Sequence, residues 1–268
     1  MKRSLSVLAA SAAVVLGLVV SAPAASAATG DLDLYLANPA DRSESLEALD
    51  IGNILEGDVP LVCDIVDDAD GAVPVIFNDG AWFSPGADGE VTFGRAGDVP
   101  LCGDFGVVDA DEEEAADTFA VRRGNRYFIS DQPARFNASG AAVRSFVFGR
   151  ATDQALVGDW DGDGVDTIAV RRGSTIFYAT ANVDGGGEVR TSSYGRPLDI
   201  AVAGDFTGQG YDTVAVRRGS AFFVSQGRPG QLLSTSSSFQ YGRASDVPVA
   251  GEPFRGENSF FGVVRIER

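Results

Sequence analysis

The chain has 268 residues, no histidine, and 38 acidic against 21 basic residues, which gives a formal net charge of -17. The lack of histidine excludes Ser-His-Asp and Cys-His nucleophilic sites, His-ligated zinc and a histidine general base, and the acidic balance argues against nucleic-acid binding. Hydrophobic residues make up 44% of the chain, which is a globular composition, and the 33 glycines indicate the many tight turns of an all-β fold.

The N-terminal segment has the organisation of a secretory signal peptide. Lys2 and Arg3 are followed by an apolar stretch at residues 5–20 and by Ala25-Ser26-Ala27, the small-residue pattern that signal peptidase cleaves. The alternative is an N-terminal membrane anchor, but the apolar stretch is short for a span and the cleavage signal follows directly. We therefore expect a signal peptide at residues 1–27, export by the general secretory route, and a mature domain at residues 28–268 without a membrane span.

One repeated unit accounts for the rest of the chain. Clear copies cover residues 93–130, 148–180 and 194–225, a fainter copy covers residues 51–84, and a fifth begins at Tyr241. The clear copies share a Phe-Gly-Arg or Tyr-Gly-Arg start, a Gly-Asp pair and a segment reading Ala-Val-Arg-Arg-Gly. The equivalent acids lie 40, 55, 46 and 47 residues apart, and they are Asp64, Asp104, Asp159, Asp205 and Glu252.

Each copy predicts four short antiparallel strands. In the copy at 148–180, residues 155–157 lead into a Gly-Asp turn, residues 167–171 alternate as a strand, and Arg172-Gly173-Ser174 forms a hairpin turn before a strand at 175–179. A fourth strand runs to Tyr194. Four strands in a repeat of this length are typical of a β-propeller blade, whereas a β-solenoid would have shorter, more uniform coils and a β-sandwich would not repeat.

The two ends of the chain complement each other. The last copy stops at its second strand, near Ile266, whereas residues 33–37 resemble the third strand of the other copies. We therefore expect residues 33–37 to pair with residues 260–266, so that strands from both termini close the ring and no edge strand is exposed. The predicted fold is an all-β propeller of five four-stranded blades.

The Phe-Gly start and the turn Gly-Asp-Trp-Asp-Gly-Asp-Gly at residues 158–164 resemble the FG-GAP/VCBS-type repeat, which builds the integrin α-chain head and many secreted bacterial propellers. The form that includes Ala-Val-Arg-Arg-Gly is similar to one common in secreted actinobacterial proteins. The resemblance covers about residues 31–268. It implies a fold more than a function, because propellers host many functions.

The resemblance also implies calcium binding in a turn of the form D-x-D-x-D-G-x-x-D. The first three acids and the glycine are present here, and a backbone carbonyl follows, but the ninth position is Thr167, with an acid one residue earlier. The alternative interpretation is a solvated acidic turn. The predicted Ca²⁺ ligands are Asp159, Asp161, Asp163, Val165, Asp166 and Thr167.

The other copies keep less of the calcium pattern. The turn at 205–210 keeps its glycines but has lost two acids, so we expect hydrogen bonds alone to hold it, and the segment at 252–255 cannot bind calcium. The longer loop at 109–117 has acids at four ligand positions, but Glu114 replaces the glycine. A flexible acidic insertion is favoured there over a second calcium site.

Arginines recur in two sets. We expect them to pair with the acids Asp117, Asp166 and Asp212 and so to join blades, and the alternative is a ring of arginines that binds an anionic polymer. Trp82 is expected in the core, and Trp160 either in the core or exposed within its acidic loop. The arginines are Arg95, Arg150, Arg196 and Arg243 after the Phe-Gly or Tyr-Gly start, and the pairs Arg122-Arg123, Arg171-Arg172 and Arg217-Arg218.

Cys63 and Cys102 are the only cysteines, and they fall one position apart in successive copies of the repeat. Neighbouring blades bring their first strands together, so a disulfide is expected in an oxidising compartment. Two buried thiols are the alternative.

Three function classes remain. We expect a monomeric, non-catalytic extracellular binding or scaffold module that contacts a surface glycan or protein through the variable polar segments 131–145, 181–193 and 227–238. The alternative is a five-bladed glycosidase with two catalytic carboxylates, for which Asp131, Asp184 and Glu188 are candidates because they lie outside the repeated positions. A third possibility is a purely structural wall component.

Overall fold

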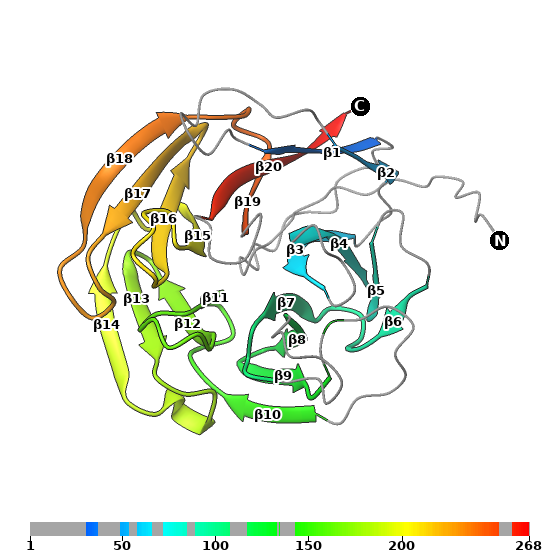
Figure 1. Ribbon diagram of the computed structural model, residues 1–268, viewed down its shortest axis with the longest axis horizontal. Coiled ribbons are helices and arrows are strands. Elements are labelled where there is room, and N and C mark those ends of the chain that lie inside the picture. Colours follow the sequence, from blue (N-terminus) through cyan, green and yellow to red (C-terminus); the bar gives the residue numbers. More distant parts are fainter. Residues whose placement is uncertain are drawn as a thin grey trace.

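The computed structural model describes residues 31–36, 49–53, 58–65, 72–84, 89–107, 117–132, 134, 143–251 and 259–267. These residues form five antiparallel sheets of four strands each, arranged in a ring (Figure 1). The predicted five-bladed, all-β propeller is confirmed. The predicted signal peptide, most of the 109–117 loop and the segment 252–255 lie outside the described residues.

The chain enters the ring in the last blade and then builds the others in order. Blade 1 contains β3 (Val59–Asp64), β4 (Ala72–Asn78), β5 (Ala81–Phe83) and β6 (Val91–Thr92). Blade 2 contains β7 (Val99–Gly103), β8 (Thr118–Arg123), β9 (Arg126–Ser130) and β10 (Val143–Val147). Blade 3 contains β11 (Gln154–Gly158), β12 (Thr167–Arg172), β13 (Thr175–Ala179) and β14 (Val189–Ser193). Blade 4 contains β15 (Ile200–Gly204), β16 (Thr213–Arg218), β17 (Ala221–Gln226) and β18 (Ser234–Gln240).

Blade 5 is assembled from both ends of the chain. Its inner strands are β19 (Val247–Gly251) and β20 (Phe260–Glu267), and its outer strands are β1 (Asp31–Leu36) and β2 (Leu49–Asn53). β1 and β20 lie side by side and antiparallel, with Leu34 opposite Val264 (Figure 1). The predicted closure by strands from both termini is therefore confirmed, with β1 extending from residue 31 to residue 36.

The hydrophobic core lies between blades, because each blade buries both of its faces. Along β12, Ile168 and Val170 pack into the cluster shared with blade 2, whereas Ala169 between them packs into the cluster shared with blade 4. Alternate side chains of a strand point to opposite faces of its sheet. Because each blade lies between two neighbouring blades, its second strand is apolar on both faces.

The aromatic residue after each Gly-Asp pair belongs to these clusters. Trp160 is 4% exposed, lies edge-on to Tyr178 at 5.1 Å between ring centroids, and donates its indole N–H to the carbonyl of Thr167 at 2.9 Å. Phe105 and Phe206 occupy the same place in blades 2 and 4 and are also buried. The core interpretation of Trp160 is confirmed, and Trp82 is likewise fully buried.

The Phe-Gly start has a packing role. Phe148 is buried between blades 2 and 3, and Gly149 has a φ of 68°. A Cβ atom on Gly149 would lie 2.9 Å from the side chain of Val170. Only glycine fits a backbone with this φ so close to the next strand.

The antiparallel order divides the described loops between two faces of the ring. The turn face carries the loops after the first and third strands, such as 159–166, 180–188 and 227–233. The hairpin face carries the hairpins after the second strands and the connections between blades, such as 172–175 and 194–199. No helix long and apolar enough to cross a membrane occurs among the described residues.

Candidate functional site

Three acids of the predicted calcium loop come together on the turn face. Asp159, Asp161 and Asp163 each place a carboxylate oxygen within 4.8 Å of the others, and Asp161 and Asp163 are exposed. We call these residues the acid triad. Carboxylate oxygens gathered in a tight turn are the donor set that Ca²⁺ prefers.

Asp159 also closes the turn by hydrogen bonds. Its carboxylate accepts the backbone N–H groups of Gly162 at 2.7 Å, Asp163 at 3.1 Å and Gly164 at 2.8 Å. Its counterpart Asp205 accepts those of Thr207, Gln209 and Gly210 at 3.3, 3.0 and 2.7 Å. The acid-poor turn is therefore closed by hydrogen bonds, as expected, and the same backbone shape forms without the second and third acids.

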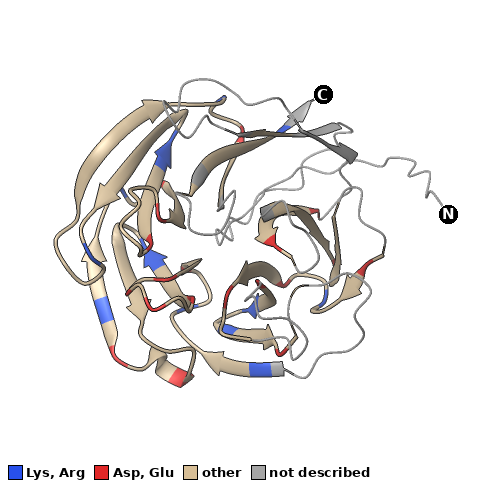
Figure 2. Cartoon of the chain, in the orientation of Figure 1, with Lys and Arg blue, Asp and Glu red and all other residues tan. Residues whose placement is uncertain are grey.

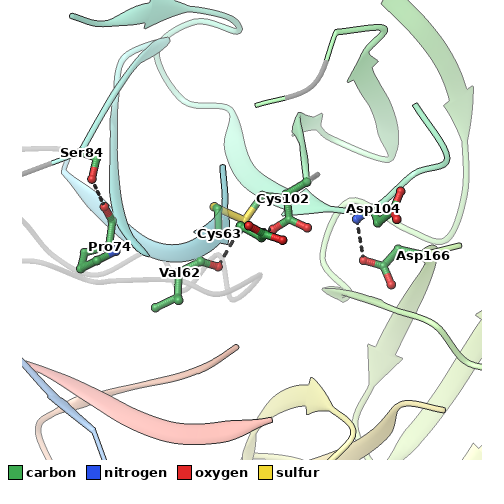
Figure 3. The surroundings of a disulfide bond; sticks show 9 residues. Val62, Cys63, Pro74, Ser84, Cys102, Asp104 and Asp166 are labelled. Atoms are coloured by element: carbon green, nitrogen blue, oxygen red, sulfur yellow. Dashed lines mark hydrogen bonds between the residues drawn. A yellow bond between two sulfur atoms is a disulfide. The ribbon is translucent and has the colours of Figure 1, made fainter. Parts of the chain in front are cut away.

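The predicted ligands Asp166 and Thr167 are directed elsewhere. The Asp166 carboxylate accepts the backbone N–H of Asp104 in blade 2 at 2.9 Å (Figure 3). The Thr167 hydroxyl donates to the carbonyl of Ala179 at 2.9 Å. Val165 stays in the turn, where its N–H donates to the Asp163 carboxylate at 2.9 Å. Of the six predicted ligands, the structure gathers the three triad carboxylates and engages two other side chains in blade contacts.

The acid at the Asp166 position couples neighbouring blades at three boundaries of the ring, between blades 1 and 2, 2 and 3, and 3 and 4. Asp117 accepts the N–H of Asp64 at 2.9 Å, and Asp212 accepts that of Asp159 at 3.0 Å. Burial raises the pKa of the Asp166 carboxyl well above its usual range, and repulsion by the carboxylates of Asp212 and Asp117 raises it further.

This coupling explains the glycine of the Gly-Asp pair. A Cβ atom on Gly103 would lie 2.4 Å from the Asp166 carboxylate, and one on Gly158 would lie 2.6 Å from that of Asp212. The next blade's acid therefore needs the space that a glycine leaves. The sequence pattern suggested a metal or arginine partner for these acids, because a backbone N–H has no signature in the sequence.

The second arginine of each pair binds an aspartate of the connection between blades, a different acid from the predicted partners Asp117, Asp166 and Asp212. In blade 3, Arg172 donates to both carboxylate oxygens of Asp153, at 2.7 and 2.5 Å. Each such pair joins the hairpin of a blade to the connection that enters the same blade, and each aspartate is buried. The pairs are Arg123–Asp98, Arg172–Asp153, Arg218–Asp199 and Arg265–Asp246.

The first arginine of each pair joins one blade to the next. Arg171 is 4% exposed and donates to the carbonyls of Asp199 and Arg196, each at 2.6 Å. Arg122 and Arg217 make the same contacts one blade earlier and one blade later. We call these contacts arginine clasps. The structural interpretation of the arginine pairs is correct, but the partners are carbonyls and different aspartates.

The boundary between blades 1 and 2 has a disulfide in place of a clasp. Phe77 stands in β4 where β8 has Arg122, since each lies opposite the first residue of the preceding strand. Cys63 of β3 is bonded to Cys102 of β7, with Cα atoms 6.0 Å apart (Figure 3). The predicted disulfide is confirmed, and Cys63 occupies the place of the glycine in the Gly-Asp pair.

A groove lies beside the acid triad on the turn face. It has a volume of about 320 Å³ between β14 and the 227–233 loop, with Trp160 among its lining residues. Arg190 and Arg228 line it, and both are exposed. The Arg228 guanidinium lies 4.5 Å above the centre of the Tyr211 ring and donates to the carbonyl of Asp161 at 3.5 Å. The groove and the acid loop are therefore in direct contact.

The candidate glycosidase acids differ in their surroundings. Asp184 accepts the backbone N–H of Val147 at 2.8 Å and so joins blade 3 to blade 2. Asp131 is in the loop after β9, and Glu188 is exposed before β14.

No family model matches the chain, and neither do curated proteins or solved structures.

Proposed function

We propose that this chain is a secreted, non-catalytic binding module, a calcium-stabilised propeller of the FG-GAP/VCBS type that recognises a surface glycan or protein on its turn face. The observation that carries the proposal is the groove between β14 and the 227–233 loop, in contact with the acid triad. Its lining is polar and cationic, and it is held by a rigid ring. Divergent loops on a rigid scaffold are the usual location of ligand contacts.

The calcium part of the proposal rests on the donor set. The acid triad offers three carboxylates, and the carbonyl of Val165 with water molecules would complete an oxygen shell. Bound Ca²⁺ would offset the mutual repulsion of the carboxylates and stiffen the turn. Because Arg228 contacts the carbonyl of Asp161, a stiffer turn would also hold one wall of the groove in place.

Binding is favoured over catalysis because most of the charged residues already make structural contacts. The recurring aspartates accept backbone hydrogen bonds or pair with arginines, and among the glycosidase candidates Asp184 joins two blades. The lack of histidine closes the common nucleophile-activation schemes. The glycosidase is the alternative because Glu188 is an exposed acid in a variable loop.

A polysaccharide and cell-surface binding panel tests the proposal, scored for retention and for released reducing sugar. We expect retention without sugar release, and Arg228→Gln should weaken retention about tenfold, as loss of a charge-assisted contact does. Arg95→Gln, a matched exposed arginine on the hairpin face, should leave it unchanged. Sugar release that disappears in Glu188→Gln would instead establish the glycosidase.

A further inference from the structure

The hairpin face has the opposite charge from the protein as a whole. Four of the connections between blades, at 93–98, 148–153, 194–199 and 241–246, contain eleven arginines and four aspartates together with the adjoining strand ends, in a chain with a net charge of -17. Figure 2 shows basic segments at the ends of β12, β16 and β20. The aspartates are Asp98, Asp153, Asp199 and Asp246, and each is buried against an arginine of its own blade.

Three arginines of the connections have no part in these ion pairs. Arg95, Arg150 and Arg196 are exposed, and their guanidinium groups make no hydrogen bond or ion pair with the described part of the chain. Their own loop aspartates are already bonded in bidentate fashion to the strand arginines. Unpaired, exposed guanidinium groups are ready donors for an anion from outside.

One connection differs from the others in shape. A groove of about 580 Å³ lies between blades 4 and 5 and is lined by Arg196, Arg218 and Pro197-Leu198, among others. Leu198 is 94% exposed. The corresponding positions of the other connections are Ala-Gly, Ala-Thr and Ala-Ser. Proline and leucine beside an unpaired guanidinium, that of Arg196, therefore occur at this connection and at no other described one.

The floor of the groove adds positive charge. Arg217 lines it, is 3% exposed, and has an Nε atom without a hydrogen-bond partner. Burial lowers the pKa of this guanidinium, and the charge of Asp246 offsets part of that effect. Strands of five residues place the acidic turn face about 16 Å away, beyond the Debye length of about 8 Å at physiological ionic strength. The acidic turns therefore oppose an anion here only weakly.

We propose that this groove binds an acidic polysaccharide. Arg196 and the free Nη1 of Arg218 contact the carboxylate or sulfate of one sugar, and Pro197 and Leu198 pack on the apolar face of its ring. A simple polyphosphate matches the charge but has no apolar face to cover Leu198. The site lies on the opposite face from the groove of the proposed function, so the two can fail separately.

Calorimetric titration of the full chain with oligogalacturonate, dextran sulfate, polyphosphate and neutral dextran tests the proposal. We expect both acidic polysaccharides to bind, and dextran and polyphosphate to bind at least about tenfold more weakly. Binding of only one acidic polysaccharide identifies the anionic group. Equal binding of dextran, or of polyphosphate, would overturn the proposal.

Two variants in the groove and two control variants outside it locate the site. Arg196→Gln should weaken binding of the acidic polymers about tenfold, whereas Arg150→Gln, at the same position of the preceding connection, should change it less than about twofold. Leu198→Ser should weaken oligogalacturonate more than polyphosphate. Equal losses in Arg196→Gln and Arg150→Gln would show a diffuse charged surface and contradict the groove. Arg228→Gln on the turn face should have no effect on this binding.

Discussion

Asp159 and Asp205 hold the same position in successive blades, and each closes its turn with three backbone hydrogen bonds. What distinguishes the blade 3 turn is the two additional acids, Asp161 and Asp163, which the backbone shape does not require. Asp163 accepts the N–H of Val165, whereas the Asp161 carboxylate accepts no hydrogen bond from the described residues, so its repulsion by the other two acids lowers stability unless a cation binds. Removing the Asp161 charge should therefore lower stability when Ca²⁺ is bound and raise stability when Ca²⁺ is absent.

Asp161→Asn should abolish the rise in melting temperature that Ca²⁺ gives the native chain. In the presence of a chelator the same variant should melt slightly above the native chain, because one repelling charge is gone. Differential scanning calorimetry with and without Ca²⁺ measures both effects, and Glu188→Gln is the control for general loss of an exposed acid. A native melting curve that Ca²⁺ leaves unchanged would contradict the calcium site.

Asp166 and Asp199 should respond to pH in opposite directions. The raised pKa of Asp166 means that the folded chain holds this proton more tightly, so its ionisation lowers stability as pH rises from the ordinary value of 3.8 toward the folded pKa. Burial alone would raise the pKa of Asp199, but hydrogen bonds from Arg218 and the Arg196 backbone outweigh it and lower the pKa. Asp199 therefore stabilises the fold above 3.8 and loses this effect as pH falls.

Urea unfolding from about pH 2 to about pH 8 tests this pair, because the Asp199 effect is lost only below its ordinary pKa. Asp166→Asn keeps an oxygen for the Asp104 N–H, and its stability relative to the native chain should rise with pH. Asp199→Asn should cost about 2 kcal/mol at neutral pH, from a charged hydrogen bond, and less in acid. The calcium effect should survive in Asp166→Asn; its loss would return Asp166 to the set of metal ligands.

At the scale of the elements, the five blade boundaries are secured by different means. Arginine clasps join blade 2 to 3, 3 to 4 and 4 to 5, and the disulfide joins blade 1 to 2. At the boundary between blades 5 and 1, the clasp position is Val264, which packs in a cluster with Leu34, Ile76 and Val249. The covalent bond thus stands at one of the two boundaries that lack a clasp.

Replacing both cysteines with alanine should lower the free energy of unfolding by about 4 kcal/mol, from the entropy of a loop closed over 39 residues. Chemical denaturation of the native and double-variant chains gives this difference. A reducing agent should destabilise the native chain and leave the variant unaffected. Two titratable thiols in the unfolded native chain before reduction would contradict the bond.

The sequence was sufficient to predict the strands that occur at the same position in every copy of the repeat. The strand at 175–179 matches β13 residue for residue, and the closure by both termini followed from the half-copies at the ends. Arginine partners were not predictable, because two sets of aspartates recur in step with the arginines and spacing alone does not separate them. Carbonyl acceptors of the clasps and the two grooves depend on backbone direction and shape, which the repeat pattern does not encode.

For the whole molecule, the pairing of β1 with β20 turns five sheets into one ring. Without β1, the edge of β20 would present unpaired backbone groups beside the buried side chains of Val263 and Val264. Open apolar edges of this kind pair with other chains.

Deletion of residues 28–50 should therefore cause aggregation or loss of cooperative unfolding. Deletion of residues 28–30, which precede β1, is the control and should behave as the native chain. Size-exclusion chromatography and thermal melting report the two outcomes. A soluble, cooperative monomer after the longer deletion would show that the ring does not depend on this closure.

The same closure fixes the order in which the blades can form during synthesis. Among the 20 strands of the described residues, β1 is synthesised first and its partner β20 last. Blades 1 to 4 consist of consecutive strands and can pair as they emerge, but blade 5 has to wait for β20, and blade 1 lacks one of its neighbours until then. The ring therefore stays open until β20 is available to pair with β1.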